Sequence, residues 1–336
     1  MKKNPIRNLI SLGQQWRTQD PFVFCAFHPD AFPGANDALG PKEGLAGRQL
    51  GQDFSNKEGW SMYHGKRVPG FPAHPHSGFE TITIVTEGFV DHADSLGSQG
   101  RFGEGDAQWM TAGKGVLHSE MFPLLNPDEN PFQLFQIWLN LPDKSRGVSP
   151  HYKMFWKEDI PVYQDKGLEV TIIAGSFGNM VALPPPPESW AASPQNDVQI
   201  WKIKIEPGER LTIPKSKYVV NRSLFFFEGD TIRIHTQNIK FMDGVELDPA
   251  EEVEVENTST KSAHLIFLQG KAINEPYVQH GPFIAATRKD LQKVSQRYLQ
   301  TQFGGWPWET QEPIFDRDAG RFSKNEKSEF HPGQNE

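Results

Sequence analysis

The chain has 336 residues and a formal net charge of −8, and its 34 Lys and Arg residues form no dense block. This pattern excludes the basic surface typical of a nucleic-acid-binding protein, so we expect no direct binding to nucleic acid. The 24 Phe, 30 Gly and 27 Pro residues exclude a disordered chain and favour many short strands with tight turns over a helical bundle.

Cysteine content and the N-terminus indicate the compartment. Cys25 is the only cysteine in the sequence, which excludes an internal disulfide and fits a reducing compartment. The apolar run after the two N-terminal lysines is broken by Arg7, Asn8 and Gly13, and is too short for a signal peptide. No stretch approaches the roughly 18 apolar residues of a membrane helix. We therefore expect a cytoplasmic, monomeric protein whose lone thiol is packed in the core.

The first half of the chain predicts a succession of short strands. DPFVFCAF at 20–27 is apolar on both faces, and ETITIVTEGFVDHAD at 80–94 alternates in polarity around a Glu-Gly turn, as a hairpin does. More strands follow up to Leu141, and a barrel or jelly roll is the natural way to close them. The irregular segment of 35–70 leads directly into a histidine-rich pattern, so we interpret it as a cover.

The second half repeats this style. Its strand-like segments are separated by turn signals, and the four prolines at 184–187 mark an extended crossing, because proline cannot lie inside a sheet. Apolar residues at 291, 294 and 298 have the spacing of an amphipathic helix. We therefore predict an all-β fold with two tandem jelly-roll barrels and a short C-terminal helix. The first domain is placed at 1–145, the second at 146–320, and a polar, frayed tail at 321–336.

Two short patterns carry the candidate chemistry. His74-Pro-His76 and His118-Ser-Glu120 each place two metal-binding side chains two residues apart. In an extended strand, residues i and i+2 point to the same face, so each pattern offers two donors to one point. We therefore predict one metal ion held between two facing strands, with His74, His76, His118 and Glu120 as the candidate ligands.

The donor set limits the metal and leaves one ligand open. Three imidazoles are too nitrogen-rich for Mg or Ca, and the lack of thiolates argues against a structural zinc site. Iron, manganese, cobalt, nickel, copper and zinc remain. Glu80 has the same parity as His76, so the residues alone barely separate Glu80 from Glu120 as the carboxylate ligand. His64 is a further candidate, although a loop histidine without metal is the simpler interpretation.

Several segments resemble hallmark segments of the pirins, a branch of the cupin superfamily. They are HPHSGFETIT, DSLGSQGRFGEGDAQWMTAGKGVLHSE, FQIWLNLP and EVTIIAGSFG, in that order, followed by INEPYVQHGPFIAAT and YLQTQFGGWPW. The resemblance runs from about residue 20 to 310 and is most specific in the long segment that contains HSE.

The resemblance implies a two-barrel protein, a bicupin. One iron ion would be bound in the N-terminal barrel by His74, His76, His118 and Glu120, and none in the C-terminal barrel. On this pattern Glu80 is not a ligand. The chain departs from the pattern at Ser77, where pirins usually have Arg, and in the segment of 35–70, which is longer than in common pirins.

The resemblance also implies two kinds of function. Some pirins resemble quercetin 2,3-dioxygenases, so the first hypothesis is an enzyme that takes a flavonol or similar aromatic substrate and O2, with Glu120 as the catalytic residue that accepts the hydroxyl proton. Others are iron-dependent, redox-sensing partners of regulatory proteins, and this alternative needs no catalysis. A sugar or small-acid enzyme of the wider cupin type fits the aromatic surroundings less well.

Overall fold

The computed structural model describes residues 3–325 and 327–333. The chain divides into two compact units, each built from stretches that are distant in the sequence. Unit 1 contains the residues up to Ala26 together with Ile137–Asn140 and Asp159–Asn274, and unit 2 contains Phe27–Gln136, Leu141–Glu158 and the residues from Glu275 onward. The chain therefore passes between the units within two long strands, β3 (Phe22–Pro33) and β10 (Glu129–Asn140).

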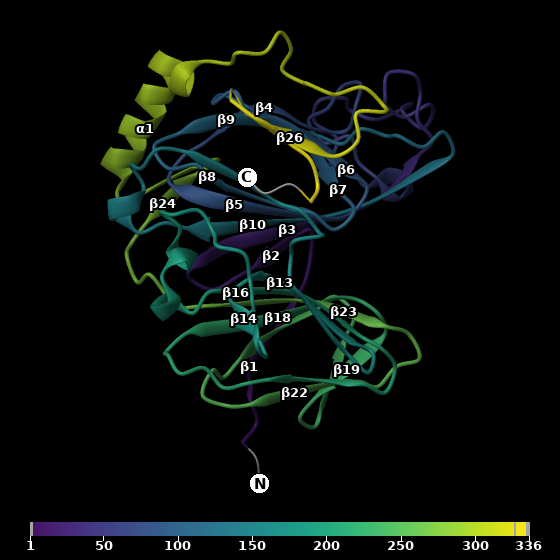
Figure 1. The fold of residues 1–336 in the computed structure, drawn as a ribbon, viewed down its shortest axis with the longest axis vertical. Coiled ribbons are helices and arrows are strands. Elements are labelled where there is room, and N and C mark those ends of the chain that lie inside the picture. The colour runs from purple at the N-terminus through teal and green to yellow at the C-terminus, as the bar shows by residue number, and fades with distance from the viewer. Residues whose placement is uncertain (1–2, 326, 334–336) are drawn as a thin grey trace. The chain divides into compact units, whose positions relative to one another are not determined.

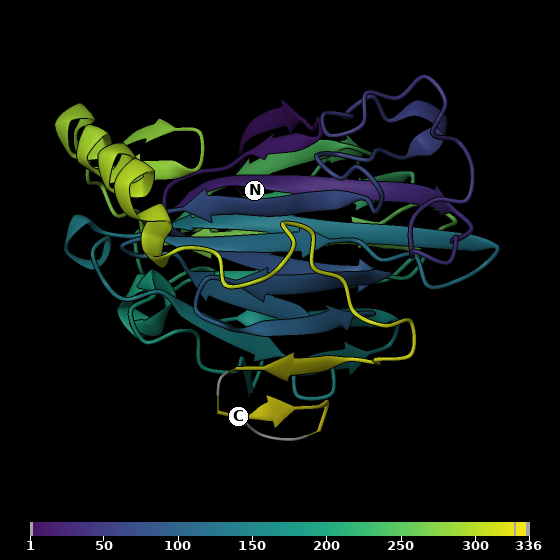
Figure 2. The same cartoon turned by 90° about the horizontal axis from the view of Figure 1, so that it is seen from above.

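Unit 2 is a barrel of antiparallel strands in two sheets. One sheet has the order β11-β8-β5-β10-β3-β2, and the other has the order β27-β26-β7-β6-β9-β4 (Figures 1 and 2). Its further strands are β4 (Gly70–His76), β5 (Phe79–Glu87), β6 (Phe89–Asp94), β7 (Gln99–Gly103), β8 (Ala107–Thr111), β9 (Val116–Met121), β11 (His151–Phe155), β24 (Val278–His280), β25 (Phe283–Ala285), β26 (Phe322–Lys324) and β27 (Glu329–Phe330). Short 3₁₀ helices lie at η1 (Lys57–Gly59), η2 (Asp143–Ser145) and η5 (Gln302–Gly304).

Unit 1 has a large sheet in the order β1-β21-β18-β23-β16-β13-β12 and a smaller one in the order β17-β22-β19-β20. The strands of the unit are β1 (Ile6–Ser11), β2 (Gln15–Arg17), β12 (Val162–Asp165), β13 (Leu168–Ala174), β14 (Ser176–Phe177), β15 (Met180–Val181), β16 (Gln199–Ile205), β17 (Arg210–Ile213), β18 (Asn221–Glu228), β19 (Thr231–Ile234), β20 (Gln237–Lys240), β21 (Asp243–Leu247), β22 (Val253–Asn257) and β23 (Ala263–Gly270). Two 3₁₀ helices, η3 (Trp190–Ala192) and η4 (Pro194–Asn196), follow the proline run.

The prediction of an all-β fold with two barrels and a short C-terminal helix is confirmed. The helix is α1 (Arg288–Thr301), and the Thr287 side chain caps it by accepting a hydrogen bond from the Asp290 N–H. The expected boundaries at 145 and 320 do not coincide with the two units. Residues up to Ala26 group with the second half of the sequence, and residues from Glu275 onward group with the first half.

The described part of the expected polar tail is paired rather than frayed. β26 forms an antiparallel ladder with β7, in which Phe322 lies opposite Arg101. Figure 2 shows β26 and β27, in yellow, at one side of this sheet, with β27 as the edge strand. Phe322 is buried, with its ring centroid 4.9 Å from that of Phe315. One apolar side chain therefore anchors a segment whose overall composition is polar.

The interior of unit 1 is apolar. Leu211, Ile213, Ile232 and Val253 pack in one core with Phe267, and all five are fully buried. Among the residues that the structure describes, the group of potential metal ligands lies in unit 2. The aliphatic filling gives a physical reason why the barrel of unit 1 does not present such a group.

The irregular segment of 35–70 is ordered by buried polar contacts within the segment itself. Arg48 donates a hydrogen bond to Asp53 Oδ2 at 2.8 Å, and its guanidinium lies 3.4 Å from the ring centroid of Trp60. The side chains of Arg48 and Asp53 are 0% and 2% exposed. A buried arginine that contacts both a carboxylate and an aromatic ring has little freedom to move, because its planar guanidinium is held by both partners. The segment is therefore an ordered part of unit 2.

A second buried group of this segment makes stability depend on pH. Asp30 accepts hydrogen bonds from the Ser61 N–H at 2.9 Å and from the Tyr63 hydroxyl at 2.6 Å. Burial raises the pKa of Asp30 from 3.8 to about 7, although these two hydrogen bonds act to lower it. Between these two values the unfolded chain has lost a proton that the folded chain retains, so stability falls as pH rises.

We expect the Asp30→Asn variant to lack this dependence. From pH 5 to pH 7, the wild-type free energy of unfolding should fall relative to that of Asp30→Asn by roughly 2 kcal/mol. Urea denaturation at both pH values measures the difference. Parallel pH profiles of the two proteins would contradict the raised pKa.

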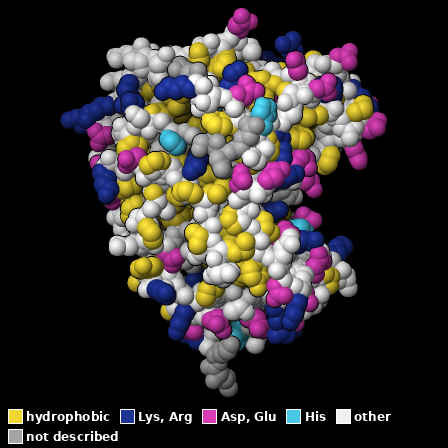
Figure 3. All heavy atoms as spheres, in the orientation of Figure 1, with side chains coloured by type: hydrophobic (Ala, Val, Ile, Leu, Met, Phe, Trp, Pro, Cys, Tyr) yellow, Lys and Arg dark blue, Asp and Glu magenta, His cyan; other side chains and the backbone are white. Residues whose placement is uncertain are grey.

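Charged side chains of both signs share the surface. On the face drawn in Figure 3, Lys and Arg lie among Asp and Glu over both units. This face therefore presents charges of both signs rather than a field of one sign.

None of the helices in the described residues combines the length and the apolar character that crossing a membrane requires.

Candidate metal centre

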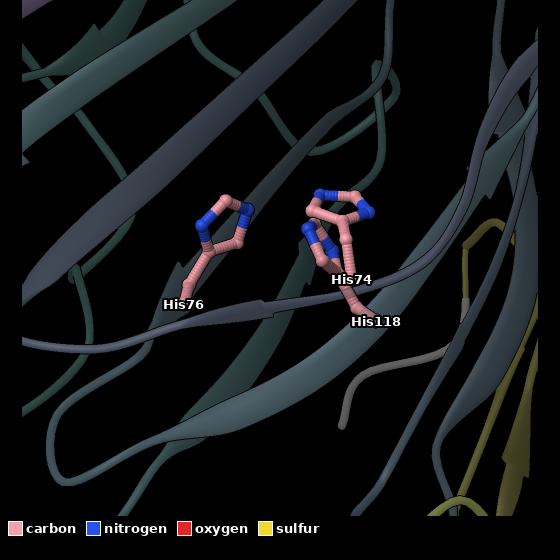
Figure 4. Close-up of side chains that lie close together, drawn as sticks. All are labelled: His74, His76 and His118. Atoms are coloured by element: carbon pink, nitrogen blue, oxygen red, sulfur yellow. The ribbon is translucent and has the colours of Figure 1, made fainter. Parts of the chain in front are cut away.

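Two neighbouring strands of unit 2 bring three imidazoles together. β4 and β9 pair antiparallel, with His74 directly opposite His118. One ring nitrogen from each of His74, His76 and His118 lies within 4.8 Å of the others. Figure 4 shows the three rings gathered from the two strands into one region. The arrangement is the one that the i, i+2 spacing favours.

A bulge and a glycine set this alignment. Phe71 lies opposite Glu120 and His74 lies opposite His118, so β4 has one more residue than β9 between these pairs. At Gly70, where φ is +127°, an added Cβ would lie 2.4 Å from the Glu120 carbonyl oxygen. Only glycine tolerates both this φ and this approach, so Gly70 lets β4 start directly against β9.

Burial keeps the three imidazoles neutral. His118 is fully buried and His76 is 4% exposed, whereas His74 is only partly buried. Burial lowers the pKa of His74 to about 4, and it lowers the pKa values of His76 and His118 well below 6.5. Neutral imidazole is the form that binds metals, so the set is ready for a cation at neutral pH.

The ring nitrogens fit a metal ion. His74 Nδ1 lies 2.9 Å from the Pro72 carbonyl oxygen, which makes Nδ1 the donor and leaves the Nε2 lone pair for a ligand. Neither ring nitrogen of the buried His118 has a hydrogen-bond partner within residues 3–325 and 327–333. A buried imidazole without partners is costly unless it binds something else. Three converging imidazole nitrogens suit a first-row transition metal.

Glu120 lies at the edge of the imidazole group. Its Oε2 is 3.6 Å from His118 Nε2, too far for a hydrogen bond, and its Oε1 is 3.0 Å from the Thr83 hydroxyl. The Thr83 hydroxyl is also 2.8 Å from Gln136 Oε1. Burial raises the pKa of Glu120 to about 7, although nearby His92 and the Thr83 bond oppose this effect. Glu120 can therefore exchange a proton near neutral pH.

The two other candidate ligands lie elsewhere. The carboxylate of Glu80 accepts hydrogen bonds from Thr111 Oγ1 at 2.7 Å and from Trp109 Nε1 at 3.3 Å. His64 is exposed, and its Nδ1 lies 2.9 Å from the Gly51 carbonyl oxygen. The group of converging ligand atoms consists of His74, His76 and His118, so it includes neither of these residues, and it does not include Glu120.

Aromatic rings from β4 and from the segment of 35–70 lie beside His74, the most exposed of the three histidines. The Phe71 ring centroid is 6.1 Å from that of His74 and 5.2 Å from that of Tyr63. Phe54, which is 42% exposed, lies 5.5 Å from Tyr63. We call Phe54, Tyr63 and Phe71 the aromatic edge. Phe54 contributes most of the exposed apolar surface of this edge, since Tyr63 is only 5% exposed.

Sequence reasoning did not identify Thr83, Gln136 or His92 as neighbours of the site. His92 lies opposite Glu120 in the ladder between β6 and β9, and its Nε2 is 3.3 Å from Asp94 Oδ2. The alternation in ETITIVTE places Thr83 on one face of its strand, which is a usable signal. The sequence does not indicate that β6 pairs with β9, or in which register, so it gave no signal that His92 lies opposite Glu120.

Two family models match the chain. The model described as Pirin matches residues 45–139, and the model described as Pirin C-terminal cupin domain matches residues 200–304. The first match includes all three histidines and Glu120. The second lies in the part of the chain that forms most of unit 1 and reaches α1.

Named relatives agree with these matches. Human pirin is 32% identical over 239 residues, which cover 69% of this chain and 77% of the relative. A Pseudomonas aeruginosa protein, provisionally named as a quercetin 2,3-dioxygenase, is 32% identical over 234 residues, which cover 69% of this chain and 79% of the relative.

A solved structure has the same fold. The crystal structure of quercetin 2,3-dioxygenase from Acinetobacter baumannii superposes with a TM-score of 0.67 at 23% identity, covering 90% of this chain and 96% of that chain. At this identity the similarity establishes the architecture alone. Together with the two family models and the 32% identity to human pirin, it shows that the chain belongs to the pirin family and has its two-cupin architecture.

Proposed function

We propose that this pirin is a metal-dependent dioxygenase of the quercetinase type, which acts on a flavonol or a similar aromatic substrate with O2. The observation that carries the proposal is the combination of three neutral imidazoles with a carboxyl group whose pKa is about 7. The aromatic edge next to His74 supports an aromatic substrate. The provisional name of the Pseudomonas aeruginosa relative supports the reaction class.

His74, His76, His118 and Glu120 would hold one iron ion. The same donors also accept nickel, manganese, cobalt, copper or zinc. When bound, such an ion acts as a Lewis acid that favours the deprotonated form of a coordinated hydroxyl group. Neutral histidines and one carboxylate leave the centre with net positive charge, which suits an anionic phenolic oxygen.

Glu120 would take the proton from the substrate hydroxyl. Its Oε1 is held by the Thr83 hydroxyl at 3.0 Å, so Oε2 would be the oxygen that either holds the ion or, when released from it, accepts the proton. Burial raises the pKa of the Glu120 carboxyl in the metal-free protein, which favours proton acceptance by the released carboxylate. The rings of the aromatic edge would stack on the substrate and limit its orientations.

The test is oxygen uptake with quercetin by protein loaded separately with iron, nickel, manganese or copper. We expect uptake with at least one metal, and we expect Glu120→Gln to reduce the rate about 100-fold or more, because glutamine cannot accept the proton. Glu129→Gln is the matched control, since Glu129 is an exposed carboxylate of the same unit. It should retain the wild-type rate.

Absence of uptake with all four metals would contradict the dioxygenase. The alternative would then be the iron-dependent redox-sensing protein that binds a protein partner. That function predicts different partner affinities for the Fe(II) and Fe(III) forms of the protein.

A further inference from the structure

The barrel of unit 2 contains a buried amide without a partner. Gln108, on β8, is fully buried, and neither Nε2 nor Oε1 has a hydrogen-bond partner among the described residues. An amide left unpaired in a protein interior typically costs about 1–3 kcal/mol. Such groups in folded proteins call for an explanation, and ligand binding is one of them.

The strand register shows where this amide points. Gln108 lies directly opposite Thr83 in the antiparallel ladder of β8 and β5, and opposite residues share one face of a sheet at a Cβ separation of about 5 Å. The Thr83 hydroxyl reaches Glu120 Oε1 at 3.0 Å. Gln108 therefore faces the barrel interior on the side of Glu120. The next residue, Trp109, faces the opposite way, where it bonds Glu80.

Two more polar groups of the barrel share this property. Thr81 lies two residues from Thr83 on β5, so its hydroxyl is on the same face of the sheet. His92 lies opposite Glu120. Both side chains are fully buried, and Thr81 Oγ1 and His92 Nδ1 have no hydrogen-bond partner in the described part of the chain. Three strands thus contribute unpaired polar atoms around one carboxylate.

We propose that Gln108 is a substrate-binding residue, whose amide pairs with a hydroxyl or carbonyl oxygen of the aromatic substrate and orients it towards Glu120. The inference rests on the proposed function and deepens it. An amide is both donor and acceptor, so it matches a ring hydroxyl as well as a ring carbonyl. Thr81 and His92 supply further polar contacts on the same side, which selects polyhydroxylated rings over purely apolar ones.

The competing role for Gln108 is structural, and one substitution separates the two. Gln108→Met has nearly the same length and volume but cannot form these hydrogen bonds. If the amide serves a ligand, its removal relieves an unpaired buried group, so the ligand-free variant should be as stable as wild type or more stable. Quercetin binding under anaerobic conditions should weaken about tenfold, and KM should rise more than kcat falls.

Gln133→Met is the matched control. Gln133 lies on β10 of the same unit, and its Oε1 accepts a hydrogen bond from the Thr86 hydroxyl at 2.7 Å. Because that amide already has a partner, the control should lose stability and keep the wild-type Kd for quercetin. Calorimetry measures the Kd for quercetin of the wild type and of both variants, and urea denaturation measures their stability. Metal analysis verifies equal metal loading of the three proteins.

The outcomes separate the two levels of the proposal. If wild-type protein binds and consumes quercetin while Gln108→Met is destabilised with an unchanged Kd, the amide is structural and this inference is overturned. If wild-type protein neither binds nor consumes quercetin, the dioxygenase and the substrate-binding role both fail. A weaker Kd without loss of stability supports the assignment.

Discussion

Replacing His118 with alanine is expected to reduce the metal content of the purified protein from about one ion per chain to near zero. His118 is the fully buried member of the group, and it alone comes from β9, so its loss leaves two imidazoles on one strand. Two histidines and a carboxylate bind divalent ions far more weakly than three histidines and a carboxylate, because each imidazole adds a coordinate bond. Activity should disappear together with the metal.

Metal analysis after dialysis measures this effect, and His151→Ala is the control. His151 is an exposed histidine on β11 of the same unit, so its replacement should leave the stoichiometry unchanged. Full metal content in His118→Ala would show that the ion binds elsewhere. Circular dichroism of the ligand-free variant distinguishes a lost ligand from a lost fold.

Arg101→Ala is expected to lower the free energy of unfolding by about 3–5 kcal/mol, the usual effect of breaking a buried ion pair from one side. Arg101 Nε and Nη2 donate to the two carboxylate oxygens of Asp91 at 2.7 and 2.8 Å, and both side chains are 0% exposed. The guanidinium also donates to the carbonyl oxygens of Phe315 and Asp316. The variant therefore removes both Arg101 bonds from the buried Asp91 carboxylate, which retains only the bond from the Phe315 N–H among its hydrogen bonds described here, and it also removes the donor to these carbonyls.

Arg210→Ala provides the comparison. Arg210 and Glu254 form an ion pair at 3.1 Å in which both side chains are about half exposed. Such pairs contribute about 0–1 kcal/mol, so urea denaturation should show a clear difference between the two variants. Equal losses would mean that Arg101 contributes no more than a surface charge.

The core of the site could be predicted from the sequence because it depends on spacing within single strands. His74 and His76 share a face of β4, and His118 and Glu120 share a face of β9. The parity rule needs no knowledge of the rest of the fold. It fails where a strand ends. Glu80 has the parity of His76, but β4 ends at His76 and β5 begins at Phe79, so the rule does not carry across the turn between them.

The remainder of the site depends on register between strands and could not be read locally. Thr83 contacts Glu120, His92 lies opposite Glu120, and Gln108 lies opposite Thr83, because β5, β8 and β6 pair as they do. A shift of one residue in any of these ladders would turn the side chain to the opposite face. The sequence specifies that register only through long-range packing.

The fold class followed from composition and from the alternation of short strands, but the division into units did not. β1 pairs with β21, so Ile6 lies opposite Leu247. β26 pairs with β7, so Phe322 lies opposite Arg101. The sequence of a short hydrophobic strand does not indicate which strand it pairs with when that partner lies more than two hundred residues away. Two similar halves are therefore most simply interpreted as two domains that follow each other along the chain.

The contribution of the residues from Glu275 onward to unit 2 has a consequence for biosynthesis. The histidine strands leave the ribosome long before α1, β26 and the carbonyl groups that receive Arg101. Until then β7 lacks its outer neighbour, and the nascent barrel is incomplete. We therefore expect an ion to be bound only after the residues from Glu275 onward have been synthesised and β26 has paired with β7.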